Sequence, residues 1–377
     1  MKVLVSGAAM AGLSTAYWFA RHGHDVTVVE QAPRIRPGGA PIDVRGAALG
    51  TAERMGILGR IRAEQVPPPT PYDVVGPDGT TRARFAIAWF GNECPDDVEI
   101  TRDRLGAALR DAVGTGPRFV FDTEVTEIDQ DDTGVTATTT ASTERYDLVI
   151  GADGLHSAVR RLVFGEEQQF VHHLGLYVAL VSLDPARSWA PGMYNAPGRM
   201  ACIRTDADGP LGMVMFRSPR LTYDFRDTAA QQRIVGDVLA TDNAWQIPWL
   251  RESILDPDRP AFYFDSISQT RMPAWHRGRV VLVGDAAHCA ALLSGMGTSL
   301  AMTGAEFLAE AVARSPDDLA AAFAGYEAHQ RPLVNRAQAG VDGNSGIMVP
   351  ETARELDRRN ALLREVAATA GGRATRS

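Results

Sequence analysis

Residues 3–12 read Val3-Leu4-Val5-Ser6-Gly7-Ala8-Ala9-Met10-Ala11-Gly12, the pattern of a buried strand, a glycine turn and a helix start. The short apolar run at 3–5 is typical of a strand covered on both faces of a parallel sheet. Residues 11–22 carry apolar side chains at helical spacing and end at Gly23, a typical helix C-terminal cap. Gly12 lacks a Cβ, so helix and strand can approach closely while the helix N-terminus turns free N–H groups toward a pyrophosphate. The pattern predicts a Rossmann-like dinucleotide-binding unit.

A second strand over residues 26–29 ends at Glu30, an acidic residue suited to bind two ribose hydroxyls. The fingerprint departs from the usual pattern at Ala9, which replaces the middle glycine of the loop. Strand, loop, helix, strand and acid together indicate a dinucleotide site, and both NAD and FAD fit them.

A later Gly-Asp pair, Gly284-Asp285, favours FAD. It follows the apolar run 279–283 and precedes Gly295-Met296-Gly297 and a helix expected from residue 298 to residue 312. An aspartate at a strand end can accept hydrogen bonds from the ribityl hydroxyls. The glycines allow backbone N–H groups at the next helix start to face the flavin pyrimidine, where negative charge collects on reduction. The same pattern also fits a strand, a turn and a helix with a capping aspartate.

Between these motifs lies Gly151-Ala152-Asp153-Gly154, which follows a strand expected at 146–149 and leads to Arg160. Asp153 is suited to cap the helix that it begins. The order and spacing of the three motifs suit one extended ligand.

The three motifs resemble those of the flavin-dependent aromatic hydroxylases, the family of p-hydroxybenzoate hydroxylase. More narrowly, the chain is similar to the tetracycline-inactivating and polyketide-hydroxylating flavin monooxygenases. The resemblance covers residues 1–340 in motif order. It implies that the following residues bind FAD: Gly7, Ala9, Met10, Ala11, Gly12, Glu30, Asp43, Arg45, Arg102, Asp153, Asp285, Gly295, Gly297, Thr298 and Ser299.

The resemblance also implies the reaction. NAD(P)H visits transiently and reduces FAD, O₂ forms a C4a-hydroperoxyflavin, and one oxygen atom passes to an aromatic or polyketide-like molecule such as a tetracycline-like compound. Arg34 and Arg36 are candidate nicotinamide-nucleotide contacts, although the sequence favours solvated loop charges at these positions. Because the flavin carries the chemistry, no catalytic side chain and no metal site is predicted. The chain departs from the family at Ala291 and Leu292, where prolines are common, and at Ser299, where asparagine is usual.

The motif positions predict an α/β fold: a discontinuous Rossmann-like FAD domain, an inserted, mostly antiparallel β-sheet substrate domain and a C-terminal helix. The predicted FAD-binding domain comprises residues 1–72, 98–165 and 271–345. The predicted substrate domain comprises residues 73–97 and 166–270, and the C-terminal helix and tail comprise residues 346–377. Alternating stretches in the inserted region predict the antiparallel strands. Their apolar side chains Met213, Met215 and Phe216 are candidate substrate contacts, although each also fits a core position.

Composition supports a cytoplasmic enzyme without a nucleic-acid or membrane partner. The 377 residues are 45% hydrophobic, carry a formal net charge of −8 and include three cysteines without paired-motif spacing. No apolar run reaches membrane-spanning length. The sequence does not predict an oligomeric state.

Two alternative functions remain open at this point. A flavin-dependent halogenase needs a lysine to relay hypohalous acid, and the only lysine, Lys2, lies in the first strand. A non-hydroxylating flavin- or ligand-binding relative is supported only by the departures at Ala9, Ala291, Leu292 and Ser299.

Overall fold

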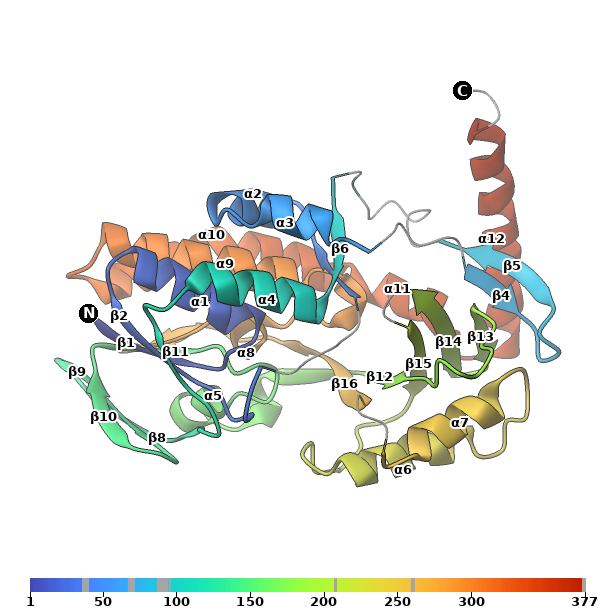
Figure 1. Ribbon diagram of the computed structural model, residues 1–377, viewed down its shortest axis with the longest axis horizontal. Helices are drawn as coiled ribbons and strands as arrows, with labels where there is room; N and C mark the ends of the chain where they lie inside the picture. The colour runs from blue at the N-terminus through green and yellow to red at the C-terminus, as the bar shows by residue number, and fades with distance from the viewer. Residues whose placement is uncertain are drawn as a thin grey trace. The chain divides into compact units, whose positions relative to one another are not determined.

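The computed structural model describes residues 1–35, 41–66, 72–86, 94, 96–206, 209–258 and 262–374. The chain divides into two compact units (Figure 1). Unit 1 consists of Met1–Gln65, Asp96–His172 and Ser268–Val341. Unit 2 consists of Val66–Pro95, His173–Ile267 and Asp342–Ser377.

Unit 1 is built around a six-stranded sheet with the order β17-β18-β11-β1-β2-β7. Neighbouring strands from β18 to β7 are parallel, and β17 is antiparallel to β18. The central strands are buried apolar runs, as expected for a parallel sheet covered on both faces. The strands are β1 (Lys2–Ser6), β2 (Asp25–Val29), β7 (Arg118–Val120), β11 (Leu148–Gly151), β17 (His276–Arg277) and β18 (Val280–Leu282).

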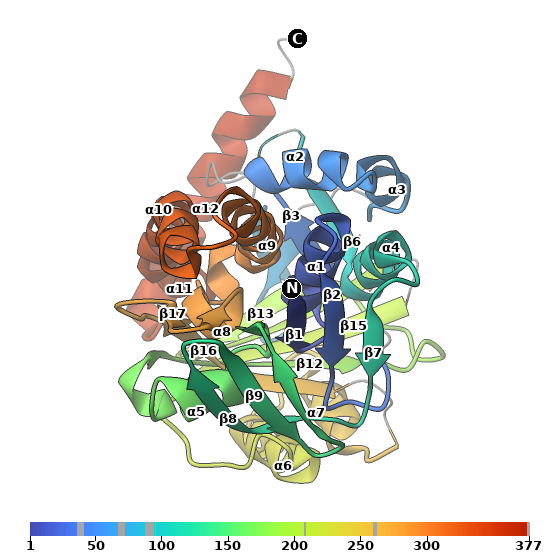
Figure 2. The ribbon, with the colours of Figure 1, turned by 90° about the vertical axis from the view of Figure 1, so that its left-hand side faces the viewer.

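Different elements cover the two sides of this sheet. Figure 2 shows α1, α4 and α9 together on one side of the parallel strands and the small β8–β9–β10 sheet on the other. The helices of unit 1 are α1 (Met10–Arg21), α2 (Ala47–Arg54), α3 (Leu58–Ala63), α4 (Arg102–Val113), α5 (Ala158–Val163), α8 (Asp285–His288), α9 (Gly297–Arg314) and α10 (Leu319–Ala339), with the 3-10 turns η2 (Glu167–Gln169) and η3 (Leu292–Ser294). The remaining strands are β3 (Pro41–Val44), β6 (Val98–Thr101), β8 (Val125–Asp131), β9 (Gly134–Thr139) and β10 (Thr143–Tyr146). The expected Rossmann-like architecture is confirmed.

Unit 2 is built around a seven-stranded sheet with the order β16-β12-β15-β14-β13-β4-β5. The pairs β12/β15, β15/β14, β14/β13 and β4/β5 are antiparallel, while β4 runs parallel to β13. The strands are β4 (Tyr72–Val75), β5 (Thr81–Phe85), β12 (Val171–Ser182), β13 (Gly192–Ala196), β14 (Arg199–Asp206), β15 (Gly209–Arg217) and β16 (Phe262–Thr270). The mostly antiparallel sheet inserted into the chain is therefore confirmed.

Helices α6 (Thr228–Leu239) and α7 (Ile247–Leu255) pack on one face of this sheet. The core between them contains stacked aromatic rings, with Tyr177 and Phe264 at 5.4 Å and Tyr177 and Phe216 at 5.5 Å between centroids. The chain ends with α11 (Val341–Met348) and α12 (Ala353–Ala374), and α12 packs against β5 and β13. Among the helices described, none is long and apolar enough to cross a membrane.

Candidate functional site

The three sequence motifs meet at one edge of the unit 1 sheet. The Gly7 N–H donates to Val29 O at 2.8 Å, which joins the glycine loop to the end of β2. The Ala152 N–H donates to Ser6 O at 2.8 Å, and the Val283 N–H donates to Gly151 O at 2.9 Å. Since ligands of open α/β sheets bind beyond the carboxyl ends of the strands, the motifs share the expected edge.

The glycines at this edge are required by close backbone packing. Gly7 has φ +102°, and a Cβ there would lie 2.5 Å from Ala152 O. A Cβ on Gly12 would overlap the Gly7 carbonyl oxygen. Gly284 has φ +63°, and its Cβ would lie 2.7 Å from the Ala11 Cβ. The first and third motifs are therefore in direct contact through positions where side chains do not fit.

The N-terminus of α1 is available to bind an anion. Its N-cap residue, Ala9, makes no side-chain capping hydrogen bond, and the first turn contains no acidic residue. Ala9 has φ −85°, which any residue adopts, and both Ala9 and Met10 are partly exposed. The replacement of the usual glycine by Ala9 therefore causes no backbone strain. The uncapped N–H groups fit the pyrophosphate of a dinucleotide.

Glu30 fixes the glycine loop and keeps capacity for a ligand. Its Oε2 accepts the Ala8 N–H at 2.8 Å, and its Oε1 accepts the Ala32 N–H at 2.9 Å. A carboxylate has about four acceptor positions, so hydroxyl donors can still bind. This arrangement fits the ribose contact expected at the end of β2.

Arg160 bridges the second and third motifs, and Asp153 stabilises the start of the helix that carries Arg160. Asp153 accepts the Ser157 hydroxyl and, at 3.1 Å, the Val159 N–H, so it caps the start of α5. Burial raises the pKa of the Asp153 carboxyl, and these hydrogen bonds partly offset the effect. Arg160 is completely buried and donates to Ala286 O at 2.9 Å. The bridging role of Arg160 was not predicted, because Ala286 lies in a distant part of the sequence.

Asp285 and His288 differ sharply in accessibility. Asp285 is exposed at the start of α8, and its backbone oxygen accepts the Thr270 hydroxyl at 2.9 Å. His288 is 2% exposed and lies 3.3 Å from the Tyr326 hydroxyl. Burial lowers the pKa of His288 to about 3. Asp285 is therefore accessible to solvent, whereas His288 is a neutral core residue at neutral pH.

Ser299 connects two segments expected beside the flavin ring. Its buried Oγ accepts the Arg45 N–H at 2.8 Å and donates to Asp43 O at 3.2 Å. Arg45 also forms an ion pair with Asp43 at 3.1 Å. Gly295 has φ +62° and lies against these two side chains. Replacing the usual asparagine with Ser299 thus preserves a hydrogen-bonded loop, and the loop is not loosened there.

The start of α9 is a second uncapped helix N-terminus. Its N-cap, Met296, makes no side-chain capping bond, and no acidic residue lies in the first turn, which includes Gly297 and Thr298. Upstream, Ala291 has φ +72° and ψ +152°, a strained conformation for a residue other than glycine. The exposed Leu292 follows it. Neither residue contributes a polar side chain to the loop.

The predicted arginine contacts are placed differently from one another. Arg102 is exposed at the first position of α4, directly after β6, which pairs with β3. Within the described part of the chain it forms no side-chain hydrogen bond or ion pair that would compete with a ligand. Arg34 is exposed in the loop after β2. Arg36 and the neighbouring Gly38-Gly39-Ala40 lie outside the described residues.

The three candidate substrate residues lie on opposite faces of the unit 2 sheet. Met213 and Met215 alternate with Phe216 along β15, so their side chains point to the other face. Phe216 is 3% exposed and packs among the aromatic rings beneath α6 and α7. Phe216 and the two methionines therefore lie on different faces of the sheet, and their contact with a substrate stays a prediction. On the methionine face, Met215 pairs with Met200, and Met213 pairs with Cys202, which in turn pairs with Met193.

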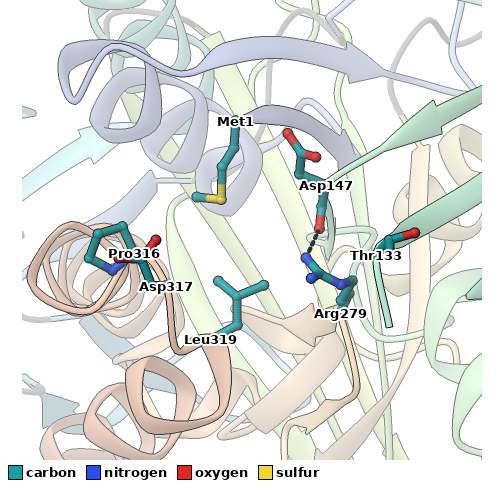
Figure 3. A pocket seen from close by; sticks show the side chains of 7 residues that line it. All are labelled: Met1, Thr133, Asp147, Arg279, Pro316, Asp317 and Leu319. Atoms are coloured by element: carbon teal, nitrogen blue, oxygen red, sulfur yellow. Dashed lines mark hydrogen bonds between the residues drawn. The ribbon is translucent and has the colours of Figure 1, made fainter. Parts of the chain in front are cut away.

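A pocket of about 520 Å³ in unit 1 is lined by Met1, Thr133, Asp147, Arg279, Pro316, Asp317 and Leu319 (Figure 3). It is next to the amino ends of β1, β11 and β18, near Met1, Asp147 and Arg279. Arg279 donates to Asp147 O at 3.2 Å. Because cofactors bind at the carboxyl edge of such sheets, this pocket is not the dinucleotide site. No group of three or more His, Cys, Asp and Glu residues suited to a metal was found among the described residues.

Comparison with known proteins identifies the class of this chain. The FAD binding domain family model matches residues 1–208 and 261–336, and the chain belongs to this family. An uncharacterized protein of Mycobacterium tuberculosis is 39% identical over 375 residues, covering 94% of this chain and 96% of that protein. A flavin-dependent monooxygenase of Legionella longbeachae is 32% identical over 388 residues, covering 99% of this chain and 97% of that protein.

Solved structures agree with this assignment. The crystal structure of tetracycline destructase Tet(51) superposes with a TM-score of 0.84 at 30% identity, covering 98% of this chain and 97% of that one. The chain is thus an FAD-dependent monooxygenase of the aromatic hydroxylase type.

Proposed function

We propose that this monooxygenase hydroxylates an aromatic or polyketide-like small molecule, such as a tetracycline-like compound, at the expense of NAD(P)H and O₂. The observation that carries the proposal is the set of accessible donors and carboxylates at one edge of the unit 1 sheet. They are the uncapped starts of α1 and α9 together with Glu30 and Asp285. Similarity to tetracycline destructases supports the substrate class.

The arrangement fits FAD in an extended conformation. The α1 start and Glu30 suit the pyrophosphate and adenosine ribose, through Gly7, Ala9, Met10, Ala11 and Gly12. Asp285 suits the ribityl hydroxyls, with Asp153 in the adjacent motif. The ring-side contacts we propose are Asp43, Arg45, Arg102, Gly295, Gly297, Thr298 and Ser299. Bound FAD would supply the redox chemistry, taking electrons from NAD(P)H and activating O₂ at its C4a position.

The protein's own groups act by position and charge. The N–H groups at the α9 start would stabilise negative charge on a bound ring system. The Ser299 bridge holds Arg45 and α9 at a fixed separation, so this environment is set before a ligand binds. No side chain needs to act as a nucleophile in this account.

We propose that the FAD-binding domain comprises residues 1–72, 98–165 and 271–345. The proposed substrate domain comprises residues 73–97 and 166–270, and residues 346–377 form a C-terminal helix and tail. On the methionine face of the unit 2 sheet, Met213 is partly exposed and supplies a polarizable apolar side chain suited to a flat ring system, whereas the neighbouring Met215 is 2% exposed. Arg34 is the described candidate for a transient NAD(P)H contact.

The test measures NAD(P)H and O₂ consumption with a panel of tetracycline-like compounds, simple phenols and benzoates. We expect tetracycline-like compounds to raise both rates in step and to gain one oxygen atom by mass. Coupled turnover of a small benzoate, without turnover of larger phenols, would contradict the proposed substrate class. Leu180→Met on the methionine face is a control that keeps a large apolar side chain, whereas Met213→Ala is expected to raise KM more than it lowers kcat.

A further inference from the structure

A second pocket lies in unit 2, bounded by α12 and the β4–β5 hairpin. Its volume is about 520 Å³. Figure 1 shows α12 beside β4, β5 and β13. Its charged and amide-bearing lining residues are Arg82, Asn195, Asp357, Arg359, Asn360 and Arg364. Three guanidinium groups and one carboxylate therefore give this pocket an excess of positive charge.

Arg359 is buried at this pocket without an anionic partner. Arg359 is only 5% exposed, yet it is one of the residues that line the cavity. Nε donates to Asn360 Oδ1 at 3.0 Å, Nη1 to Ile347 O at 3.0 Å and Nη2 to Asn195 Oδ1 at 2.8 Å. These acceptors are neutral, and no carboxylate of the described residues forms an ion pair with Arg359. A guanidinium has five N–H donors, so two more remain for a ligand.

The other buried arginines each lie beside a carboxylate, so the absence of an anionic partner at Arg359 is an exception among the described residues. Arg45 and Arg160 are the other arginines counted as buried in the described residues. Arg45 pairs with Asp43 at 3.1 Å, and Arg160 lies 3.6 Å from Glu167. Buried charges are normally paired, because an isolated one loses its hydration without compensation. Burial lowers the pKa of Arg359 to about 10, so it remains a cation at neutral pH.

The surrounding contacts hold Arg359 in place and add charge at the pocket. The Asn195 amide nitrogen donates to Met348 O at 2.9 Å, which fixes the oxygen that Arg359 contacts. Arg364 is exposed on α12, and its Nη1 donates to Arg82 O at 3.2 Å. Arg82 forms an exposed ion pair with Asp78 at 3.2 Å. The site therefore combines one fixed, buried guanidinium with two exposed ones.

We propose that this pocket binds the oxyanion group of a small molecule, a carboxylate or a phosphate, through Arg359, with Arg364 and Arg82 contributing long-range attraction. A planar guanidinium matches both groups and forms charge-assisted hydrogen bonds with them. The site is formed by unit 2 residues alone, whereas the FAD motifs consist of unit 1 residues. The inference therefore does not depend on the proposed hydroxylation reaction.

The test is calorimetric titration of the FAD-loaded full chain with inorganic phosphate and, separately, with benzoate, at constant ionic strength. FAD loading fills the other anion-binding helix starts. We expect saturable binding of at least one probe at one site per chain, weakened about tenfold or more by Arg359→Gln. Arg364→Gln, which changes an exposed residue, is expected to weaken binding severalfold without affecting folding.

Arg358→Gln is the matched control, since Arg358 is an exposed neighbour on α12 that does not line the pocket. Binding of phosphate alone that Arg359→Gln weakens identifies a phosphate site, and binding of benzoate alone that Arg359→Gln weakens identifies a carboxylate site. Absence of saturable binding of either probe to the unmodified chain would overturn the proposal. Equal weakening by Arg364→Gln and Arg358→Gln would also overturn it, because the effect would then be general charge.

Discussion

Gly12→Ala tests whether the glycine loop is packed as tightly as FAD binding requires. The new methyl group would overlap the Gly7 carbonyl oxygen, whereas real Cβ contacts essentially never fall below 3.0 Å. Because the oxygen belongs to the backbone, the start of α1 and the loop must move apart. That movement displaces the uncapped N–H groups proposed to bind the pyrophosphate.

The expected cost follows from overpacking in a close-packed region. Inserting a methyl group without space typically costs about 1–3 kcal/mol. A cost of this size in the FAD-binding conformation corresponds to a dissociation constant raised roughly 5- to 150-fold. Gly106→Ala is the matched control on α4, because its added Cβ would meet only the mobile end of Met10, at 3.4 Å. It is expected to be neutral or slightly stabilising, since alanine favours a helix more than glycine does.

The assay is fluorescence titration of each apoprotein with FAD, together with the thermal unfolding midpoint. Gly12→Ala should weaken FAD binding and lower the midpoint, while Gly106→Ala should match the unmodified chain. If Gly12→Ala bound FAD with unchanged affinity, the assignment of α1 as the pyrophosphate site would be refuted.

Three further predictions concern single side chains. Asp285→Asn should weaken FAD binding by about 1–3 kcal/mol in a fluorescence titration. The control is Asp103→Asn, which replaces an exposed carboxylate at the start of α4 and should leave FAD binding unchanged. Equal losses of affinity in the two variants would contradict the assignment of Asp285 to the ribityl chain. Ser299→Ala should lower the free energy of unfolding in denaturant by about 1–3 kcal/mol, because the buried Arg45 N–H and the partly buried Asp43 carbonyl oxygen lose their partner. An unchanged free energy would show that the bridge is dispensable. The pKa of His288 is about 3 in the folded chain, below the ordinary value of 6.5. Because the unfolded chain binds a proton at this histidine more readily, the contribution of neutral His288 to the free energy of unfolding is complete above pH 6.5 and is lost as the pH falls toward 3. His288→Gln should therefore remove up to about 1.4 kcal/mol per pH unit from the slope of stability below pH 6.5, relative to a His329→Gln control, and identical slopes would exclude this effect.

Much of the dinucleotide site could be predicted from the sequence, because its parts obey local rules. A buried strand followed by a glycine turn places Gly7, Glu30 and Asp285 at strand ends. Parallel strands bring such ends to the same edge of a sheet, whatever their separation in sequence. Ala9 is a departure because its methyl group stands where a glycine lets the backbone approach the phosphate, and its φ of −85° shows that alanine adopts this backbone conformation without strain.

Contacts between distant segments could not be predicted in this way. The Ser299 bridge to Arg45, and the Arg160 bond to Ala286, depend on tertiary packing that no local pattern records. The isolation of Arg359 is likewise visible only once its neighbours are known. The separation of Met215 from Phe216 was accessible from the sequence, since adjacent residues of a strand point to opposite faces.

Oxygen-isotope labelling tests the central claim of FAD-dependent monooxygenation most directly. The FAD-loaded chain is incubated with NAD(P)H and a tetracycline-like or polycyclic phenolic substrate under ¹⁸O-labelled O₂, and the product is analysed by mass spectrometry. The account predicts a product that carries one labelled oxygen atom from O₂ and none from water, with NAD(P)H consumed in step. A product whose new oxygen comes from water would contradict it, as would NAD(P)H-independent product formation.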